Sequence, residues 1–214
     1  MSSNFFKGGF SVAGCVPEVL ELLALLHEHV DRHAIIGGGF LRDLRIHDKQ
    51  GKDIDAFVHY DAPIEVFAEK VYELTSLMGI GYSQLYMFTD RVTLPGWDTC
   101  ALLKFEFLGQ DIDLMFIDKP VSGLWYLARV NFGVNQIWCD GVRFFEGTAF
   151  KRDNEDQTIT LINSATQREV ARNLKKADDL LARLEWQDWR FVCALTDAEI
   201  DSLPTGKIPS KDHA

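Results

Sequence analysis

The segment GGGFLRDLRIHDKQGKDIDAF, which begins at Gly37, constrains the fold of this chain more than any other part of the sequence. Its glycines follow a short apolar stretch, and its last residues alternate between charged and apolar side chains. Because alternate residues of a strand share a face, Asp53 and Asp55 should point the same way, with their apolar neighbours on the other face. The pattern predicts a strand at 33–36, a glycine turn, a helix at 40–46 and a strand at 53–59.

Hydrophobic periodicity predicts further helices at 17–31, at 63–78, at 121–137 and from Ser164 onward, where Gln167 completes a capping-box pattern. The last of these has an expected apolar stripe of Val170, Leu174, Ala177, Leu181 and Leu184. Strands are predicted within 83–117, with short candidates at 82–89 and 91–94, a turn at Pro95-Gly96 and a hairpin at Gly109, and also at 158–162. Asp140-Gly141 predicts another hairpin. The predicted fold class is α/β (α+β), a short mixed β-sheet backed by helices with a helical C-terminal extension, divided as 1–150, 151–202 and a flexible tail at 203–214.

Composition excludes some classes of protein. The 214 residues carry a net charge of −10, whereas a generic nucleic-acid binder normally has a basic balance. The four cysteines form no CxxC pair, which is typical of reduced thiols in a cytoplasmic protein. We expect no membrane association, because no apolar run approaches the length of a membrane span and MSSNFFKGGF lacks the apolar core of a signal peptide.

The glycine turn admits two interpretations. Without Cβ atoms, the backbone at Gly37 and Gly38 can approach an anion closely, and the amides at the start of the following helix can point at it. A strand, a pair of glycines and a helix are therefore a recurring phosphate-binding arrangement. The alternative is a plain tight turn.

The aspartates suggest a cation site. Asp53 and Asp55 on one strand face repel each other unless a cation neutralises them, and oxygen ligands of this kind suit Mg²⁺ or Mn²⁺. Asp113 lies in an apolar context between Ile112 and Leu114, and Asp111 precedes it on the same face. If the two strands are neighbours, three carboxylates converge. We prefer Asp113 to Asp111 as the third, because Asp111 sits next to the predicted turn.

Taken together, Gly37-Gly38, Arg42-Asp43 and Lys52-Asp53-Ile54-Asp55 resemble the head domain of the CCA-adding enzyme and bacterial poly(A) polymerase family, within the DNA polymerase β-like nucleotidyltransferase superfamily. Residues 129–135, RVNFGVN, resemble the family's Arg-Arg-Asp-Phe-Thr-Ile-Asn block, although Val130 and Asn131 depart from it. The resemblance is good over 33–59, fair over 109–143 and slight beyond. It implies a nucleotidyltransferase catalytic head at 1–150, with little room for the family's RNA-gripping domains.

The resemblance implies transfer of a nucleoside monophosphate from a nucleoside triphosphate (NTP) to an acceptor hydroxyl by a two-metal mechanism. Asp53, Asp55 and Asp113 would be catalytic and would hold Mg²⁺ or Mn²⁺. Gly37, Gly38 and Arg42 would contact phosphate, with Asp43 orienting Arg42. The full set of implied nucleotide-binding residues is Gly37, Gly38, Arg42, Asp43, Lys52, Arg129 and Asn135.

The acceptor stays open between two alternatives. The head-domain motifs favour the 3′ end of a tRNA-like RNA. The charge of −10 favours a small-molecule or protein hydroxyl, as in antibiotic-modifying or toxin-type members. A third interpretation is an inactive nucleotide-binding module. The cations of the last long helix, Arg168, Arg172, Lys175, Lys176 and Arg183, fit an RNA backbone or a solvated face. The aromatic residues that follow could stack on bases, but we favour the alternative that they pack the end of this helix onto the core; they are Trp186, Trp189 and Phe191.

Overall fold

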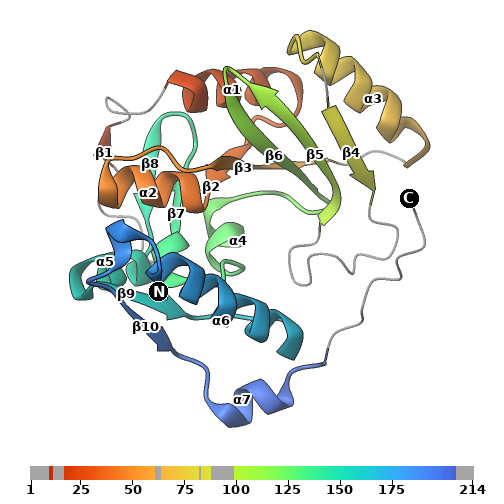
Figure 1. Ribbon diagram of the computed structural model, residues 1–214. Helices are drawn as coiled ribbons and strands as arrows, with labels where there is room; N and C mark the ends of the chain where they lie inside the picture. Colours follow the sequence, from red (N-terminus) through yellow and green to blue (C-terminus); the bar gives the residue numbers. More distant parts are fainter. Residues whose placement is uncertain (1–9, 12–16, 61–63, 82, 88–98, 206–214) are drawn as a thin grey trace, which may run out of the picture.

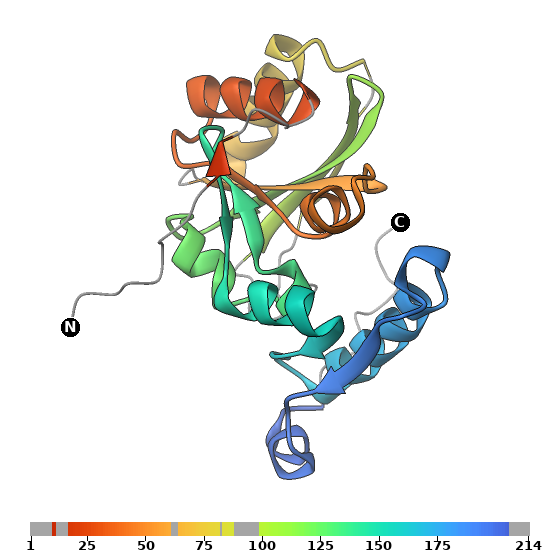
Figure 2. The ribbon, with the colours of Figure 1, turned by 90° about the vertical axis from the view of Figure 1, so that its left-hand side faces the viewer.

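The computed structural model describes residues 10–11, 17–60, 64–81, 83–87 and 99–205. The strand expected at 91–94, the Pro95-Gly96 turn and the chain beyond residue 205 lie outside the described residues. The model has a mixed sheet with helices on both faces, and a smaller C-terminal unit beside it (Figures 1 and 2). None of the described helices has both the length and the apolar composition needed to cross a bilayer.

The described strands of the main sheet follow the order β1-β8-β7-β2-β3-β6-β5-β4. Their bounds are β1 Phe10–Ser11, β2 Ile35–Gly37, β3 Asp53–His59, β4 Ser83–Met87, β5 Thr99–Phe107, β6 Gln110–Ile117, β7 Ile137–Cys139 and β8 Arg143–Glu146. Within the described residues, β3 and β6 form the sheet's one parallel pair, and the other neighbours run antiparallel. The expected hairpin at Gly109 joins β5 to β6, and Gly109 has a φ of 81° there.

Helices cover both faces of this sheet. On one face, α1 (Pro17–His29), α2 (Gly39–His47) and α3 (Ile64–Leu77) pack against the inward side of the strands, where Ile54, Leu103 and Leu114 are buried. On the other face, α4 (Gly123–Leu127) packs its Trp125 and Tyr126 over a second apolar cluster. The predicted α/β class is confirmed, and β3 begins and ends where the alternating pattern placed it.

The C-terminal unit has an apolar cluster of its own. The elements of this unit are α5 (Thr148–Asp156), β9 (Thr158–Leu161), α6 (Gln167–Leu181), η2 (Leu184–Trp186), β10 (Arg190–Cys193) and α7 (Asp197–Ser202). The strands β9 and β10 pair in parallel as a separate two-stranded sheet. Periodicity predicted β9 but not β10. Phe132 and Val134, which precede this unit in sequence, pack into the same cluster.

The helix predicted at 121–137 is much shorter in the structure, because α4 ends at Leu127 and a 3-10 turn, η1, covers Gly133–Asn135. The intervening backbone pairs with the C-terminal unit instead. Phe132 forms a β-bridge with Leu161, and the carbonyl of Asn131 accepts hydrogen bonds from the amides of Ile162 and Asn163. The backbone after Leu127 therefore forms tertiary hydrogen bonds instead of continuing the helix that its apolar pattern predicted.

The last long helix also differs in register from its prediction. Thr166, not Ser164, caps α6, because its hydroxyl accepts a hydrogen bond from the Glu169 amide. Leu174 is 40% exposed and Leu184 is 77% exposed, so neither belongs to the inward stripe. The buried positions of α6 are Glu169, Val170, Asn173, Ala177 and Leu180.

Candidate active site

Neighbouring strands bring charged side chains together in two rows on one face of the sheet. Paired residues on adjacent strands share a face, as do residues two apart on one strand, so the rows lie side by side. The first row crosses β3, β6 and β5 as Asp55, Asp113 and Lys104, and the second as Asp53, Asp111 and Glu106. We call the five acidic residues of these rows the carboxylate cluster.

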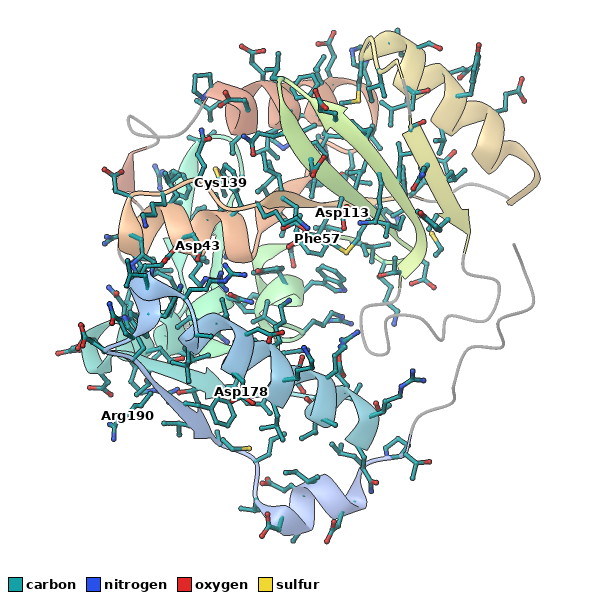
Figure 3. All side chains as sticks on the ribbon, viewed as in Figure 1. Asp43, Phe57, Asp113, Cys139, Asp178 and Arg190 are labelled. Atoms are coloured by element: carbon teal, nitrogen blue, oxygen red, sulfur yellow. The ribbon has the colours of Figure 1, made fainter. Side chains whose placement is uncertain are left out.

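The convergence expected from the sequence is therefore present in the strand register. Asp55 lies opposite Asp113, and Asp53 lies opposite Asp111, across the parallel pairing of β3 with β6. Figure 3 labels Asp113 on β6 and Phe57 on the neighbouring β3. Asp113 is partly buried while Asp111 is exposed, which matches the basis on which Asp113 was preferred.

Asp55 is the most perturbed acid of the cluster. Burial raises its pKa from the ordinary value of 3.8 to about 7, and the neighbouring charge of Asp53 adds to this. The charges of Lys176 and Lys104 oppose the rise. Desolvation and the neighbouring carboxylate thus both disfavour the charged form of Asp55.

Lys104 pairs directly with Asp113 across β5 and β6. Its Nζ lies 2.5 Å from each carboxylate oxygen of Asp113. The Lys104 side chain is 42% exposed and that of Asp113 is 20% exposed. The third carboxylate of the expected metal site therefore already has a cationic partner within the chain.

Packing alone requires glycine at positions 37 and 38 of the turn. A Cβ on Gly37 would lie 2.5 Å from Cζ of Tyr126, and a Cβ on Gly38 would lie 2.8 Å from Oδ2 of Asp55. Gly38 also has a φ of 88°, in the left-handed region that favours glycine. The turn thus brings its backbone against Asp55, the acid with the raised pKa.

Tyr126 is a residue of this site that sequence reasoning missed. Its hydroxyl donates to the carbonyl of Asn135 at 2.8 Å, and a backbone hydrogen bond from Gly38 also reaches it. Burial, followed by the charge of Asp55, raises the pKa of Tyr126 well above 10, so the phenol stays protonated. The only signal in the sequence was its place in an apolar run, which predicts core packing equally well.

Arg42 and Asn135, two predicted nucleotide-binding residues far apart in sequence, meet in the structure. Arg42 is buried, and its guanidinium donates to Oδ1 of Asn135 at 3.0 Å and to Oδ1 of Asp43 at 2.6 Å. Asp43 and Asn135 therefore both hold the Arg42 guanidinium within the chain. This contact joins the glycine-turn helix α2 to η1.

The C-terminal unit reaches the same arginine. The guanidinium of Arg42 lies 5.2 Å from the centre of the Trp186 ring, and His47 of α2 meets Trp186 edge-on at 4.6 Å. Trp186 is completely buried, so it packs the end of the C-terminal unit onto the core as the sequence suggested. This packing fixes one side of Arg42.

The remaining predicted residues lie at the margins. Lys52 is exposed and lines a cavity of 670 Å³ together with Asp53, Asp111 and Asp113. Arg129 turns toward α4, where its guanidinium donates to the Trp125 carbonyl at 3.2 Å and stacks on the Trp125 ring. The structure thus gathers the glycines, the aspartates, Arg42 and Asn135, with Lys52 nearby and Arg129 held elsewhere.

A second cavity, of 310 Å³, lies between the glycine turn and α6. Its polar lining residues are Asp55, Asn131, Asn135, Arg172, Asn173 and Lys176, and the lining also includes Gly38, Phe57, Met115 and Tyr126. Arg172 is paired with Glu169 at 3.1 Å. Part of the basic face of α6 therefore lines a cavity beside Asp55, while Lys175 pairs with Asp179 on the exposed side.

The described side chains of the carboxylate cluster are not arranged as a complete set of metal ligands. Within the described ranges, no group of three or more His, Cys, Asp or Glu side chains is arranged to hold a metal ion. The carboxylate oxygens of Asp53 and Asp55 nevertheless have the chemistry of Mg²⁺ or Mn²⁺ ligands.

Known structures share this mixed α/β fold. No protein-family model and no curated protein sequence matches the chain. An apo CCA-adding enzyme matches with a TM-score of 0.59 at 18% identity, covering 89% of this chain and 44% of that one. A CCA-adding enzyme with ATP gives 0.58 at 18% identity, covering 88% and 44%. The Thermotoga maritima CCA-adding enzyme with tRNA gives 0.57 at 20% identity, covering 88% and 42%.

These similarities show the fold. The chain spans less than half the length of the matched structures.

Proposed function

We propose that this protein is a template-independent nucleotidyltransferase, which transfers a nucleoside monophosphate from an NTP to an acceptor hydroxyl and releases pyrophosphate. The observation that carries the proposal is the register of β3 and β6, which sets Asp55 beside Asp113 and Asp53 beside Asp111. A cavity lined by polar and basic side chains adjoins these carboxylates, where a nucleotide would fit.

The residues present fit a divalent cation at Asp53 and Asp55. Both side chains leave the same face of β3, and Gly38 keeps the space next to Oδ2 of Asp55 free of a Cβ. We propose Asp113 as the third ligand of a two-metal site. Bound Mg²⁺ or Mn²⁺ would neutralise the triphosphate and lower the pKa of the acceptor hydroxyl.

The chain's own side chains would bind and orient the nucleotide. Arg42 is held by Asp43 and Asn135 in one position, so it would meet a phosphate group without first losing conformational freedom. The amides of Gly37 and Gly38 would contact the triphosphate. Lys52 would approach a phosphate from solvent, and Arg129 would reach base or ribose only after leaving the Trp125 carbonyl.

We propose the 3′ end of a tRNA-like RNA as the acceptor. Several structures with the same fold are CCA-adding enzymes, one of them solved with tRNA, which supports this choice. The cations of α6 that line the cavity beside Asp55 also support it. The chain would act in the cytoplasm, with residues 1–150 as catalytic head, 151–202 as extension and 203–214 as tail.

A second candidate keeps the chemistry and changes the acceptor to a small-molecule or protein hydroxyl. The net charge of −10 favours it, because an acidic chain repels an RNA backbone at long range. The two candidates differ in the product that carries the transferred nucleotide.

The test is a transfer assay with labelled ATP, CTP, GTP and UTP, Mg²⁺ or Mn²⁺, and total RNA that includes tRNA. The control is the Asp53→Asn/Asp55→Asn double variant, which keeps the shape of both side chains. Label in RNA that disappears in the control supports the first candidate. Label in protein or in a small molecule supports the second. NTP binding without transfer to any acceptor would overturn both and favour an inactive nucleotide-binding module.

A further inference from the structure

The contact between Lys104 and Asp113 has the geometry of an ion bound at a carboxylate. Nζ of Lys104 lies 2.5 Å from both oxygens of Asp113, so one ammonium group engages the whole carboxylate. The two residues face each other across β5 and β6 in the strand register.

We propose that Lys104 acts as an internal cation that occupies Asp113 when no nucleotide is bound. The carboxylate cluster would then take up a first divalent ion at Asp53 and Asp55, and a second at Asp113 only after Lys104 leaves. The inference rests on the proposed function, since it concerns the order in which that site fills.

Electrostatics explains why a lysine suits this position. The cluster concentrates carboxylates on adjacent strands, and like charges at this spacing repel unless a cation lies between them. Arg would hold a carboxylate in a planar fork, whereas the ammonium of Lys is a compact charge on a flexible stem. Lys104 is 42% exposed, so it has solvent into which to swing when a divalent ion competes for Asp113.

A bound triphosphate would favour this exchange. Lys104 and Asp113 line the same 670 Å³ cavity as Lys52 and Asp53, so the ammonium has space beside the cluster in which to meet an anionic phosphate. Moving Lys104 from Asp113 to a phosphate keeps one ion pair while freeing two carboxylate oxygens. Binding of the nucleotide and of the second divalent ion would then assist each other.

Mn²⁺ binding to nucleotide-free protein tests the proposal without any catalytic readout. The wild type, stripped of metal with a chelator, should bind one Mn²⁺ tightly by electron paramagnetic resonance and calorimetry. Lys104→Met should bind two, with the second site tightened about tenfold or more, since a competing unit charge is removed at contact distance. Lys104→Gln provides a second neutral variant should Lys104→Met fold poorly, and Lys104→Arg, which keeps the ion pair, should behave as the wild type.

The matched control is Lys52→Met, which removes the same charge from the same cavity but from an exposed residue that does not bond Asp113. It should tighten Mn²⁺ binding only about two- to threefold and leave the stoichiometry at one, because exposed charges are screened by salt. Two equally tight sites in the wild type, or one site in both neutral Lys104 variants, would overturn the role of Lys104 and leave the proposed function standing. A wild type that binds no Mn²⁺ would overturn both.

Discussion

Asp55 should destabilise the folded protein at neutral and alkaline pH. Its pKa rises from an ordinary 3.8 to about 7, mainly because the partly buried side chain is desolvated and secondly because Asp53 is close. The difference of about 3 units corresponds to about 4 kcal/mol of unfolding free energy at about 1.4 kcal/mol per unit. Replacement by asparagine keeps the shape and removes the charge, so Asp55→Asn should recover much of this free energy.

The pH window follows from the two pKa values. Below about pH 4 both the folded and the unfolded chain hold the Asp55 proton, so the residue contributes no difference. As pH rises toward about 7, the unfolded chain releases this proton while the folded chain retains it, so the free energy of unfolding falls. Above the folded pKa the loss is complete. Asp55→Asn lacks this loss, and we expect it to exceed the wild type by about 1–4 kcal/mol near pH 8.

Urea unfolding in a chelating buffer, from about pH 4 to about pH 8, measures the difference between the two proteins. Asp111→Asn is the matched control, because it neutralises an exposed carboxylate of the same cluster and should change stability by less than about 1 kcal/mol. Saturating Mn²⁺ should stabilise the wild type more than Asp55→Asn and so narrow the gap. A difference between wild type and Asp55→Asn that stays constant with pH would refute the argument.

Two further predictions concern packing at the site. Trp186→Ala should lower the free energy of unfolding by about 3–5 kcal/mol, because it empties a completely buried position. In the transfer assay it should also raise KM for the NTP, because the Trp186 ring that packs against Arg42 is lost. An unchanged KM would argue against a role of Trp186 in positioning Arg42. Gly37→Ala should cost about 1–3 kcal/mol through its clash with Tyr126, and in a double-mutant cycle measured by urea unfolding the cost should shrink in a Tyr126→Ala background. Equal costs in both backgrounds would show that Tyr126 is not what requires the glycine.

Local patterns predicted part of the main sheet and its first connections. The alternation over 53–59 predicted β3 to the residue, and the glycine punctuation placed the turn before α2. They failed where tertiary pairing overrides periodicity, as at Asn131 and Phe132, whose backbone pairs with the C-terminal unit. The prediction for the inward face of α6 was wrong for a related reason. Buried polar residues such as Asn173 lie on this face, and a search for an apolar stripe could not find them.

The candidate site divides in the same way. The sequence indicated Asp53, Asp55 and Asp113 because carboxylates on apolar strands are unusual, and it indicated Arg42 through the resemblance. Lys104 was missed: a lysine at an alternating strand position is usually solvated, and only its place opposite Asp113 distinguishes it.

By itself, the sequence determined that Asp53 and Asp55 share a face and that a glycine turn precedes them, because strand alternation and glycine sterics act over a few residues. Only the tertiary structure decided that β6 pairs in parallel with β3, that Lys104 engages Asp113 and that Asn135 and Trp186 enclose Arg42. These contacts join segments far apart in the chain. Their geometry depends on how whole strands and helices bury their apolar faces against one another, which no local pattern records.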